Sequence, residues 1–314
     1  MTSLRKLGSS DLEVFPLALG GNVFGWTADE AATFAVLDAY TAAGGNFVDT
    51  ADAYSAWADG NSGGESETLI GNWLRARGNR DDVVIATKVS QHPDFQGLTA
   101  ANIKAAADAS LRRLGTDRID LYYTHFDKPE VPVEEIVGAL DALVKAGKVR
   151  HISASNISAE RLRASLEFSD REGLARYVAL QPHYNLVSRD TYEGELQDLV
   201  AATGLAAVPY FALASGFLTG KYRPGATVDS ARAQGAGKHL ETERGQKVLA
   251  ALDEIARAHD SEIATVALAW LAAQPTVVAP IASARTVEQL PALLGVAGLE
   301  LTEGEIGRLT EASA

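Results

Sequence analysis

Four side chains in this sequence could together hold and transfer a proton. They are Asp49, Tyr54, Lys88 and His125, and each follows a short apolar segment typical of a strand. A buried ammonium beside a phenol favours the phenolate, so we expect Lys88 to lower the pKa of Tyr54 from about 10 toward the working pH. Asp49 would keep Lys88 charged, and a neutral His125 would hydrogen-bond the same oxygen as Tyr54. This set suits the protonation of a carbonyl oxygen while the carbonyl carbon accepts a hydride.

No amino-acid side chain donates a hydride, so this chemistry implies a nicotinamide cofactor. Further polar groups follow later strand-like segments: Ser155, Asn156, Gln181 and Tyr210. Taken singly, such residues have ordinary structural explanations, such as a carboxylate that caps a turn, a surface lysine or a hydrogen-bonded core histidine. Their joint placement at strand ends favours one shared site.

The elements that would position these groups alternate along the whole chain. The strand-like segments are residues 16–19, 46–48, 83–86, 119–123, 149–152, 178–180, 206–208 and 277–279. Amphipathic helical patterns lie between them, with helix-starting residues at Thr99, Ser158 and Thr302. Strands that are apolar throughout are buried on both faces, and helical crossovers imply parallel pairing.

This alternation predicts a (β/α)8 TIM barrel in which residues 1–314 form a single domain. An open, doubly wound sheet is the alternative. Residues 4–14 predict a short N-terminal β-hairpin, and the long Gly-rich segment 211–240 predicts a functional loop. In such a barrel the βα loops at the C-terminal ends of the strands form the mouth that holds the active site.

Composition excludes several classes of protein. The net charge of −13 disfavours nucleic acid and anionic membranes as partners, because both are bound through clustered cations. The absence of cysteine excludes disulfides, zinc–thiolate sites and thiol nucleophiles. The N-terminus has no apolar signal segment, and the uncharged segments 199–218 and 266–284 are broken by Gly or Pro too often for a membrane span. We therefore expect a soluble, cytoplasmic protein, either a monomer or a simple homo-oligomer.

Other catalytic signatures are missing. The segment from Gly216 to Lys221 has neither the spacing nor the following Ser/Thr of a P-loop. No Gly-x-Gly-x-x-Gly follows a strand, which leaves a Rossmann site without support. The histidines lack metal-ligand spacing, so no metal site is expected, and the paired carboxylates of a retaining glycosidase are missing from the strand ends.

Several segments together resemble the aldo-keto reductases. They are NFVDTADAY at 46–54, GESE at 64–67, IATK at 85–88, DLYYTH at 120–125, QPHYN at 181–185 and LTGKY at 218–222. The resemblance covers about residues 4–310 in the expected order. It implies a TIM barrel that reduces aldehydes or ketones with NADPH, and a catalytic tetrad of Asp49, Tyr54, Lys88 and His125 with Tyr54 as general acid.

The resemblance also implies how the cofactor binds. Ser155, Asn156 and Gln181 would hydrogen-bond the nicotinamide carboxamide, and Tyr210 would stack on the nicotinamide ring. The pyrophosphate contacts would come from Leu213, Ser215, Gly216 and Lys221, and those to the adenosine phosphate from Ser283, Arg285 and Gln289. Two positions depart from the family pattern, because Ser283 replaces the usual Gly and Leu293 replaces an Asn that commonly meets adenine.

Arg285 is the cation best placed to bind the 2′-phosphate of NADPH, because it follows the last strand directly and guanidinium suits phosphate. Lys238 is a more distant candidate. We therefore expect NADPH to be preferred, with NADH bound at lower affinity.

The substrate pocket should be lined by loops at the same mouth. Asn22, Phe24 and Trp26 follow the first strand, and Trp57 follows Tyr54. These side chains favour an apolar or aromatic carbonyl substrate. The alternative function is that of a non-catalytic or weakly catalytic NADPH-binding regulator on the same barrel, similar to the potassium-channel β subunits.

Overall fold

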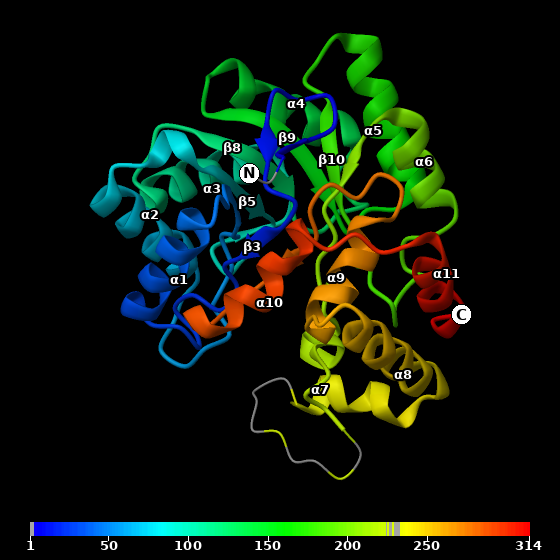
Figure 1. Cartoon of the computed structure of the whole chain (residues 1–314). Coiled ribbons are helices and arrows are strands. Elements are labelled where there is room, and N and C mark those ends of the chain that lie inside the picture. Colours follow the sequence, from blue (N-terminus) through cyan, green and yellow to red (C-terminus); the bar gives the residue numbers. More distant parts are fainter. Residues whose placement is uncertain (1–2, 224, 226–227, 229–232) are drawn as a thin grey trace.

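A computed structural model describes residues 3–223, 225, 228 and 233–314. An eight-stranded parallel sheet lies at its centre, surrounded by helices (Figure 1). In chain order its strands are β3 (Ala18–Gly20), β4 (Phe47–Asp49), β5 (Val84–Val89), β8 (Ile119–Thr124), β9 (Val149–Ser155), β10 (Tyr177–Gln181), β11 (Ala206–Ala207) and β12 (Ile281–Ala282). Across the sheet the order is β11-β10-β9-β8-β5-β4-β3-β12, so seven strands follow the order of the chain and β12 lies beside β3.

The two edges of this sheet meet. Val278 N donates to Ala207 O at 2.9 Å, and Ile281 N donates to Pro209 O at 2.8 Å. These bonds close the sheet into the predicted (β/α)8 barrel, so the alternative of an open, doubly wound sheet is wrong.

The eighth strand is shifted from its predicted position. Residues 277–279 were expected to form it, but the ladder with β3 lies at Ile281–Ala282, and Val277 makes only an isolated bridge to Ala207. Pro280 lies between the two and has no N–H to donate, which interrupts regular pairing at that point.

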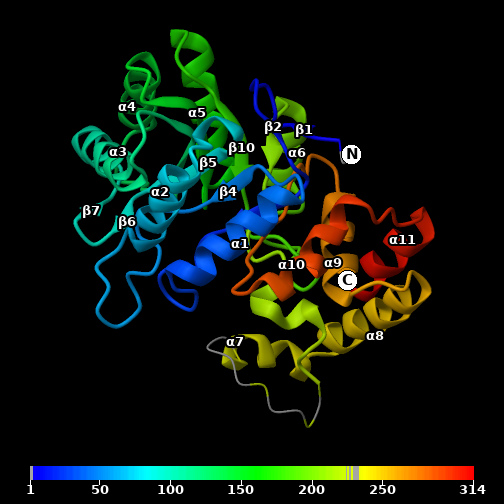
Figure 2. The ribbon, with the colours of Figure 1, turned by 60° about the vertical axis from the view of Figure 1, so that its left-hand side comes forward.

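Helices cover the outside of the barrel, as Figures 1 and 2 show. They are α1 (Glu30–Ala42), α2 (Glu65–Arg77), α3 (Ala100–Leu114), α4 (Val133–Lys145), α5 (Ala159–Glu172), α6 (Glu195–Thr203), α8 (Glu243–Ala258), α9 (Ile263–Ala272), α10 (Leu290–Leu294) and α11 (Glu303–Ala312). The side chains of Thr99, Ser158 and Thr302 accept backbone N–H groups at the starts of α3, α5 and α11, as predicted. Helix α8 packs against α9 and α11.

Shorter elements occupy the loops. They are the hairpin β6 (Gln91–His92) and β7 (Phe95–Gln96), the helix α7 (Ala233–Gly237), and the 3-10 turns η1 (Arg80–Asp82), η2 (Ala214–Thr219), η3 (Lys238–Glu241), η4 (Val287–Gln289) and η5 (Gly295–Ala297). The long segment 211–240 thus contains η2, α7 and most of η3; residues 224, 226–227 and 229–232 of it lie outside the described residues.

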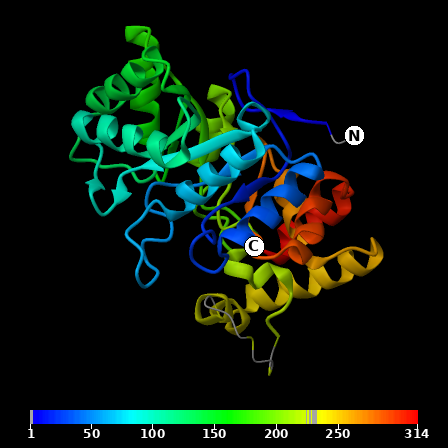
Figure 3. The same ribbon diagram turned by 90° about the vertical axis from the view of Figure 1, so that its left-hand side faces the viewer.

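The N-terminal hairpin closes one end of the barrel. Its strands β1 (Arg5–Lys6) and β2 (Glu13–Val14) pair antiparallel, as predicted. Leu7 and Leu12 are buried in one apolar cluster with barrel residues such as Phe47. Gly8 has φ +57, and a Cβ there would lie 2.1 Å from Val178 O, so only glycine allows this close approach. The hairpin and α7 lie at opposite ends of the molecule (Figure 3).

Across the described residues, we find no helix with the length and apolarity needed to cross a membrane.

Candidate active site

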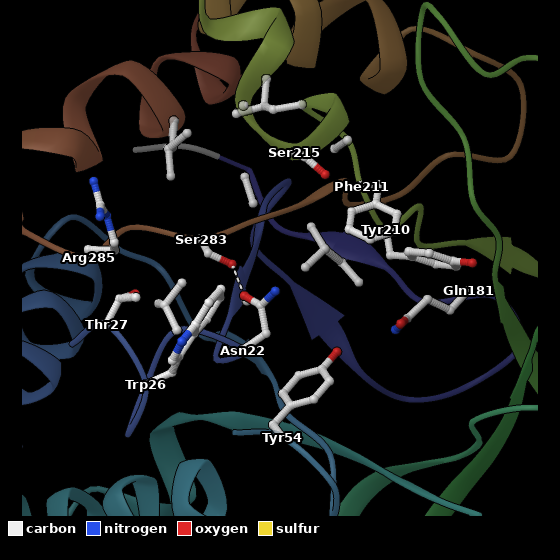
Figure 4. Close-up of a pocket in the computed structure, with 18 of the residues that line it drawn as sticks. Asn22, Trp26, Thr27, Tyr54, Gln181, Tyr210, Phe211, Ser215, Ser283 and Arg285 are labelled. Carbon is white, nitrogen blue, oxygen red and sulfur yellow. Dashed lines mark hydrogen bonds between the residues drawn. The ribbon is translucent and has the colours of Figure 1, made fainter. Parts of the chain in front are cut away.

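A cavity of about 840 Å³ opens at the C-terminal ends of the barrel strands (Figure 4). Most of the side chains singled out from the sequence line it: Asn22, Trp26, Tyr54, Trp57, His125, Ser155, Asn156, Gln181, Tyr210, Leu213, Ser215, Gly216, Lys221, Ser283, Arg285 and Gln289. Asp49 and Lys88 are buried directly behind Tyr54. The barrel therefore brings residues from the C-terminal ends of all eight of its strands to one mouth.

Lys88 connects two other members of the tetrad. It lies on β5 and is fully buried. Its Nζ is 2.6 Å from both carboxylate oxygens of Asp49, 2.7 Å from Thr50 O and 2.9 Å from Tyr54 OH. The ammonium thus donates to Asp49, to a backbone carbonyl and to the phenol oxygen. Since Tyr54 OH accepts the bond from Lys88, its own hydrogen is left to point into the cavity.

The expected direction of the pKa shift at Tyr54 is wrong. Burial raises the pKa of Tyr54 above its ordinary value, and the nearby Asp49 carboxylate adds to this, although Lys88 opposes it. Desolvation outweighs the ammonium because Asp49 already compensates much of the positive charge. Tyr54 is therefore a phenol, with its proton in place, near neutral pH.

Lys88 itself remains charged. Burial lowers the pKa of Lys88, but Asp49 and Tyr54 outweigh that effect and raise the pKa above its ordinary value. Burial raises the pKa of Asp49, and the ion pair with Lys88 opposes this rise. In a buried pair of this kind, the loss of either charge leaves the other one uncompensated.

His125 follows β8 and lines the cavity beside Tyr54, with the two ring centroids 6.0 Å apart. Burial, together with the positive charge of Lys88, holds the pKa of His125 well below its ordinary value. The imidazole is therefore neutral at pH 7. Its Nδ1 is buried and has no hydrogen-bond partner among the described residues.

The side chains of Tyr210 and Asn156 form a connected group that also lines the cavity. Tyr210 OH donates to Asn156 Oδ1 at 2.6 Å, and Asn156 Nδ2 donates to His125 O at 2.8 Å. Asn156 has φ 47, a left-handed conformation that asparagine tolerates better than most residues. One face of Tyr210 is stacked on His183, at 5.4 Å between ring centroids and 22° between planes. Tyr210 thus has a rigid backing where it borders the cavity.

Cations border the cavity at a distance from Tyr54. Figure 4 shows Arg285 on the far side of Ser283 and Asn22 from Gln181 and Tyr210. Arg285 N donates to Gln289 Oε1 at 2.8 Å, and Ser283 Oγ donates to Asn22 Oδ1 at 2.7 Å. Asn22, expected on the substrate side, is therefore bonded to a residue expected on the cofactor side.

Some expected residues do not fit the cavity. Phe24 is fully buried in the core and does not line the cavity. It is turned inward because its backbone bridges Ala28 and its carbonyl accepts the Ser55 hydroxyl at 2.7 Å. Lys238 is exposed and does not line the cavity. Leu293, which departs from the family pattern, does line it.

The structure adds lining residues that were not expected from the sequence, among them Gln91, Phe126, Phe211 and Glu262. Phe126 and Phe211 directly follow His125 and Tyr210, so their position after the strand ends could have indicated them. Among the residues that the structure describes, no group of three or more His, Cys, Asp or Glu could hold a metal ion.

The sequence matches the model of the aldo/keto reductase family over residues 16–314. With the barrel and the residues at its mouth, this match shows that the chain belongs to the aldo/keto reductase family and is an oxidoreductase of that class.

Individual relatives agree with this assignment. The protein tas of Escherichia coli K12 is 34% identical over 97% of this chain and 96% of its own length. The norsolorinic acid reductase stcV of Emericella nidulans is 34% identical over 94% of this chain and 77% of its own length. The uncharacterized oxidoreductase YrpG of Bacillus subtilis is 34% identical over 90% of this chain and 87% of its own length.

Proposed function

We propose that this chain reduces aldehydes or ketones to alcohols with NADPH, and that Tyr54 is the general acid. The observation that carries the proposal is the bond from Lys88 Nζ to Tyr54 OH at 2.9 Å. It occupies an acceptor position of the phenol and leaves the phenolic hydrogen available to a carbonyl oxygen in the cavity. General acid catalysis requires this arrangement of a protonated donor bordering the substrate.

The residues present fit a nicotinamide dinucleotide. Tyr210 offers an aromatic face backed by His183, and Gln181 and Asn156 offer amides beside it. Lys221 and Arg285 supply positive charge elsewhere in the lining, where phosphates would require it. When bound, such a cofactor supplies the hydride, which no side chain can donate.

Each residue of the tetrad then has its own role in the transfer of the proton. Tyr54 donates its hydroxyl proton to the carbonyl oxygen, and Lys88 stabilises the phenolate that remains. Asp49 holds Lys88 charged and in place. His125 is neutral. Its buried Nδ1 carries the lone pair rather than the hydrogen, because a buried lone pair without a partner costs less than a buried N–H without one. The hydrogen is then on Nε2, which donates to the carbonyl oxygen.

The substrate side of the cavity fits an uncharged aromatic carbonyl compound. Trp26, Trp57 and Phe126 line it near Tyr54, and Trp57 contacts Trp26 edge-to-face at 5.6 Å between centroids. Within the described lining, the charged residues are Lys221, Glu262 and Arg285. The first two adjoin η2 and α9, and Arg285 follows β12, so none comes from the loops that carry the aromatic residues.

The direct test is a panel of aldehydes and ketones followed at the NADPH absorbance. We expect NADPH oxidation with several aromatic members of the panel. Binding of NADPH without turnover of any member would instead support a regulatory, non-catalytic role.

Replacing Tyr210 with Ala should weaken cofactor binding by about 5- to 150-fold, since stacking on an aromatic ring contributes roughly 1–3 kcal/mol per base. Titration of the cofactor by tryptophan fluorescence measures this change. Tyr210→Phe keeps the ring and removes only the hydrogen bond to Asn156, which separates the two contributions. An unchanged Kd in Tyr210→Ala would remove Tyr210 from the cofactor site.

Replacing Arg285 with Ala should weaken the binding of NADPH about 10- to 150-fold, because hydrogen bonds to charged groups contribute about 1.5–3 kcal/mol. NADH should be barely affected, since it lacks the 2′-phosphate. The measurement is the Kd of both cofactors for both proteins, and Arg285→Lys shows how much of the effect needs the guanidinium geometry. Equal losses for the two cofactors would refute this role.

A further inference from the structure

Ser90 has an unusual backbone conformation two residues beyond Lys88. It is buried, 1% exposed, and has φ 117, a region that residues with a side chain rarely adopt. Such strain costs about 1–3 kcal/mol and persists where the surrounding structure enforces it, often next to functional sites. At Ser90 the chain leaves β5 and enters the hairpin β6–β7, which starts at Gln91 in the lining of the cavity.

The Ser90 side chain connects two loops at the mouth of the barrel, the loop after β5 and the loop after β8. Ser90 Oγ donates to Phe126 O at 3.3 Å and accepts from Phe126 N at 3.2 Å. Phe126 lines the cavity next to His125. The loop after β5 is therefore held in a fixed position relative to the loop after β8.

The same residue fixes the direction of the Gln91 amide. Gln91 Nε2 donates to Ser90 O at 3.1 Å and to Ser90 Oγ at 3.0 Å. A carbonyl oxygen only accepts, so the nitrogen end of the amide must face Ser90. Both amide hydrogens are thereby used. Gln91 Oε1 has no hydrogen-bond donor among the described residues and is not enclosed, which leaves an oriented acceptor in a side chain that lines the cavity.

The hairpin that carries Gln91 is itself well anchored. Gln91 pairs with Gln96 across the hairpin, and Asn102 Nδ2 donates to Phe95 O at 2.9 Å and to Gly97 O at 2.7 Å. These bonds tie the hairpin to α3. An acceptor on a rigid support discriminates between ligands better than one on a loop that can adapt.

We propose that Gln91 is a specificity-determining residue, which selects aromatic carbonyl compounds that carry a hydroxyl group on the ring. Gln91 Oε1 accepts the hydrogen of that hydroxyl, while the aromatic side chains near Tyr54 pack on the ring. This proposal rests on the proposed function and adds a polar substituent to its substrate class.

The test compares hydroxyl with methyl, two substituents of similar size of which only hydroxyl donates a hydrogen bond. The probes are the ortho, meta and para isomers of hydroxyacetophenone and methylacetophenone at pH 6.5, where the phenols are protonated. For at least one isomer we expect wild-type protein to prefer hydroxyl by about 5-fold in kcat/KM, carried by KM. Gln91→Met, which keeps an unbranched side chain of similar length, should bring this ratio close to 1.

Two further variants sharpen the result. Gln96→Met makes the same change on the exposed partner in the hairpin and should keep the wild-type ratio. Ser90→Ala removes one partner of the Gln91 amide and should lower the ratio by allowing the amide to turn. Calorimetric titration of the same probes in the presence of NADP+ gives the ratio of the dissociation constants for the methyl and hydroxyl compounds, and it needs no turnover. Failure to reduce any carbonyl would therefore count against the proposed function alone.

A wild-type ratio near 1 for all three isomers would overturn the role of Gln91. So would a ratio in Gln91→Met that equals that of the wild type.

Discussion

Tyr54→Phe is expected to lower kcat for carbonyl reduction by about 10²- to 10⁴-fold, the range typical of a general acid. The substitution keeps the ring, which packs edge-to-face on Trp57 at 6.1 Å and lies 4.6 Å from Lys88 Nζ, centroid to nitrogen. The substitution removes the hydroxyl, which is both the proton donor and the acceptor of the bond from Lys88. The ring stays in place, so the Kd of the cofactor should stay within a few fold of the wild-type value. Steady-state rates on several carbonyls and a fluorescence titration measure the two quantities.

Tyr122→Phe is the matched control for this variant. The Tyr122 hydroxyl is buried and has no partner among the described residues, and it does not line the cavity. Its removal should leave the rates unchanged. Near-normal kcat in Tyr54→Phe would exclude Tyr54 as the proton donor.

Lys88→Met should abolish most activity and also destabilise the protein. Removing one partner of a buried ion pair costs about 3–5 kcal/mol, because the remaining charge is left uncompensated. Here that charge is the Asp49 carboxylate, whose pKa burial already raises. Without Lys88 the pKa of Tyr54 rises further too, since the cation that opposed its rise is gone, and a less acidic phenol is a weaker proton donor.

The loss of stability in Lys88→Met should depend on pH in a definite direction. A carboxyl whose folded pKa lies above its unfolded value, about 3.9, binds its proton more tightly when folded. The folded state is then favoured at low pH and loses stability as the pH rises through the folded pKa. We therefore expect the free energy of unfolding of Lys88→Met to fall below that of the wild type by less near pH 5 than near pH 8. Denaturant unfolding at the two pH values measures this difference.

The double variant Asp49→Asn/Lys88→Met separates stability from catalysis. It removes both charges, so it should recover much of the lost stability and lose the dependence on pH. It should remain inactive, because the cation beside Tyr54 is still missing. Should Lys88→Met match the wild type in both rate and unfolding, Lys88 would have no part in the site.

The sequence by itself determined the architecture and the location of the site. Apolar segments alternating with amphipathic helices require a parallel sheet covered by helices, and eight such units favour closure of that sheet. Parallel strands carry their C-terminal ends to one edge, so the polar residues at or just after the ends of β4, β5 and β8 had to meet there. These conclusions rest on local patterns, which a sequence displays directly.

Tertiary structure decided what depends on the surroundings of a side chain. Phe24 and Trp26 both follow β3, but the turn at Phe24–Ala28 directs Phe24 into the core while Trp26 lines the cavity. The pKa of Tyr54 rises rather than falls because burial outweighs the charge of Lys88. Gln91 lines the cavity directly after Ser90, which adopts a rare backbone conformation. Turn direction, desolvation and backbone strain arise from contacts between distant segments, and the order of residues does not contain them.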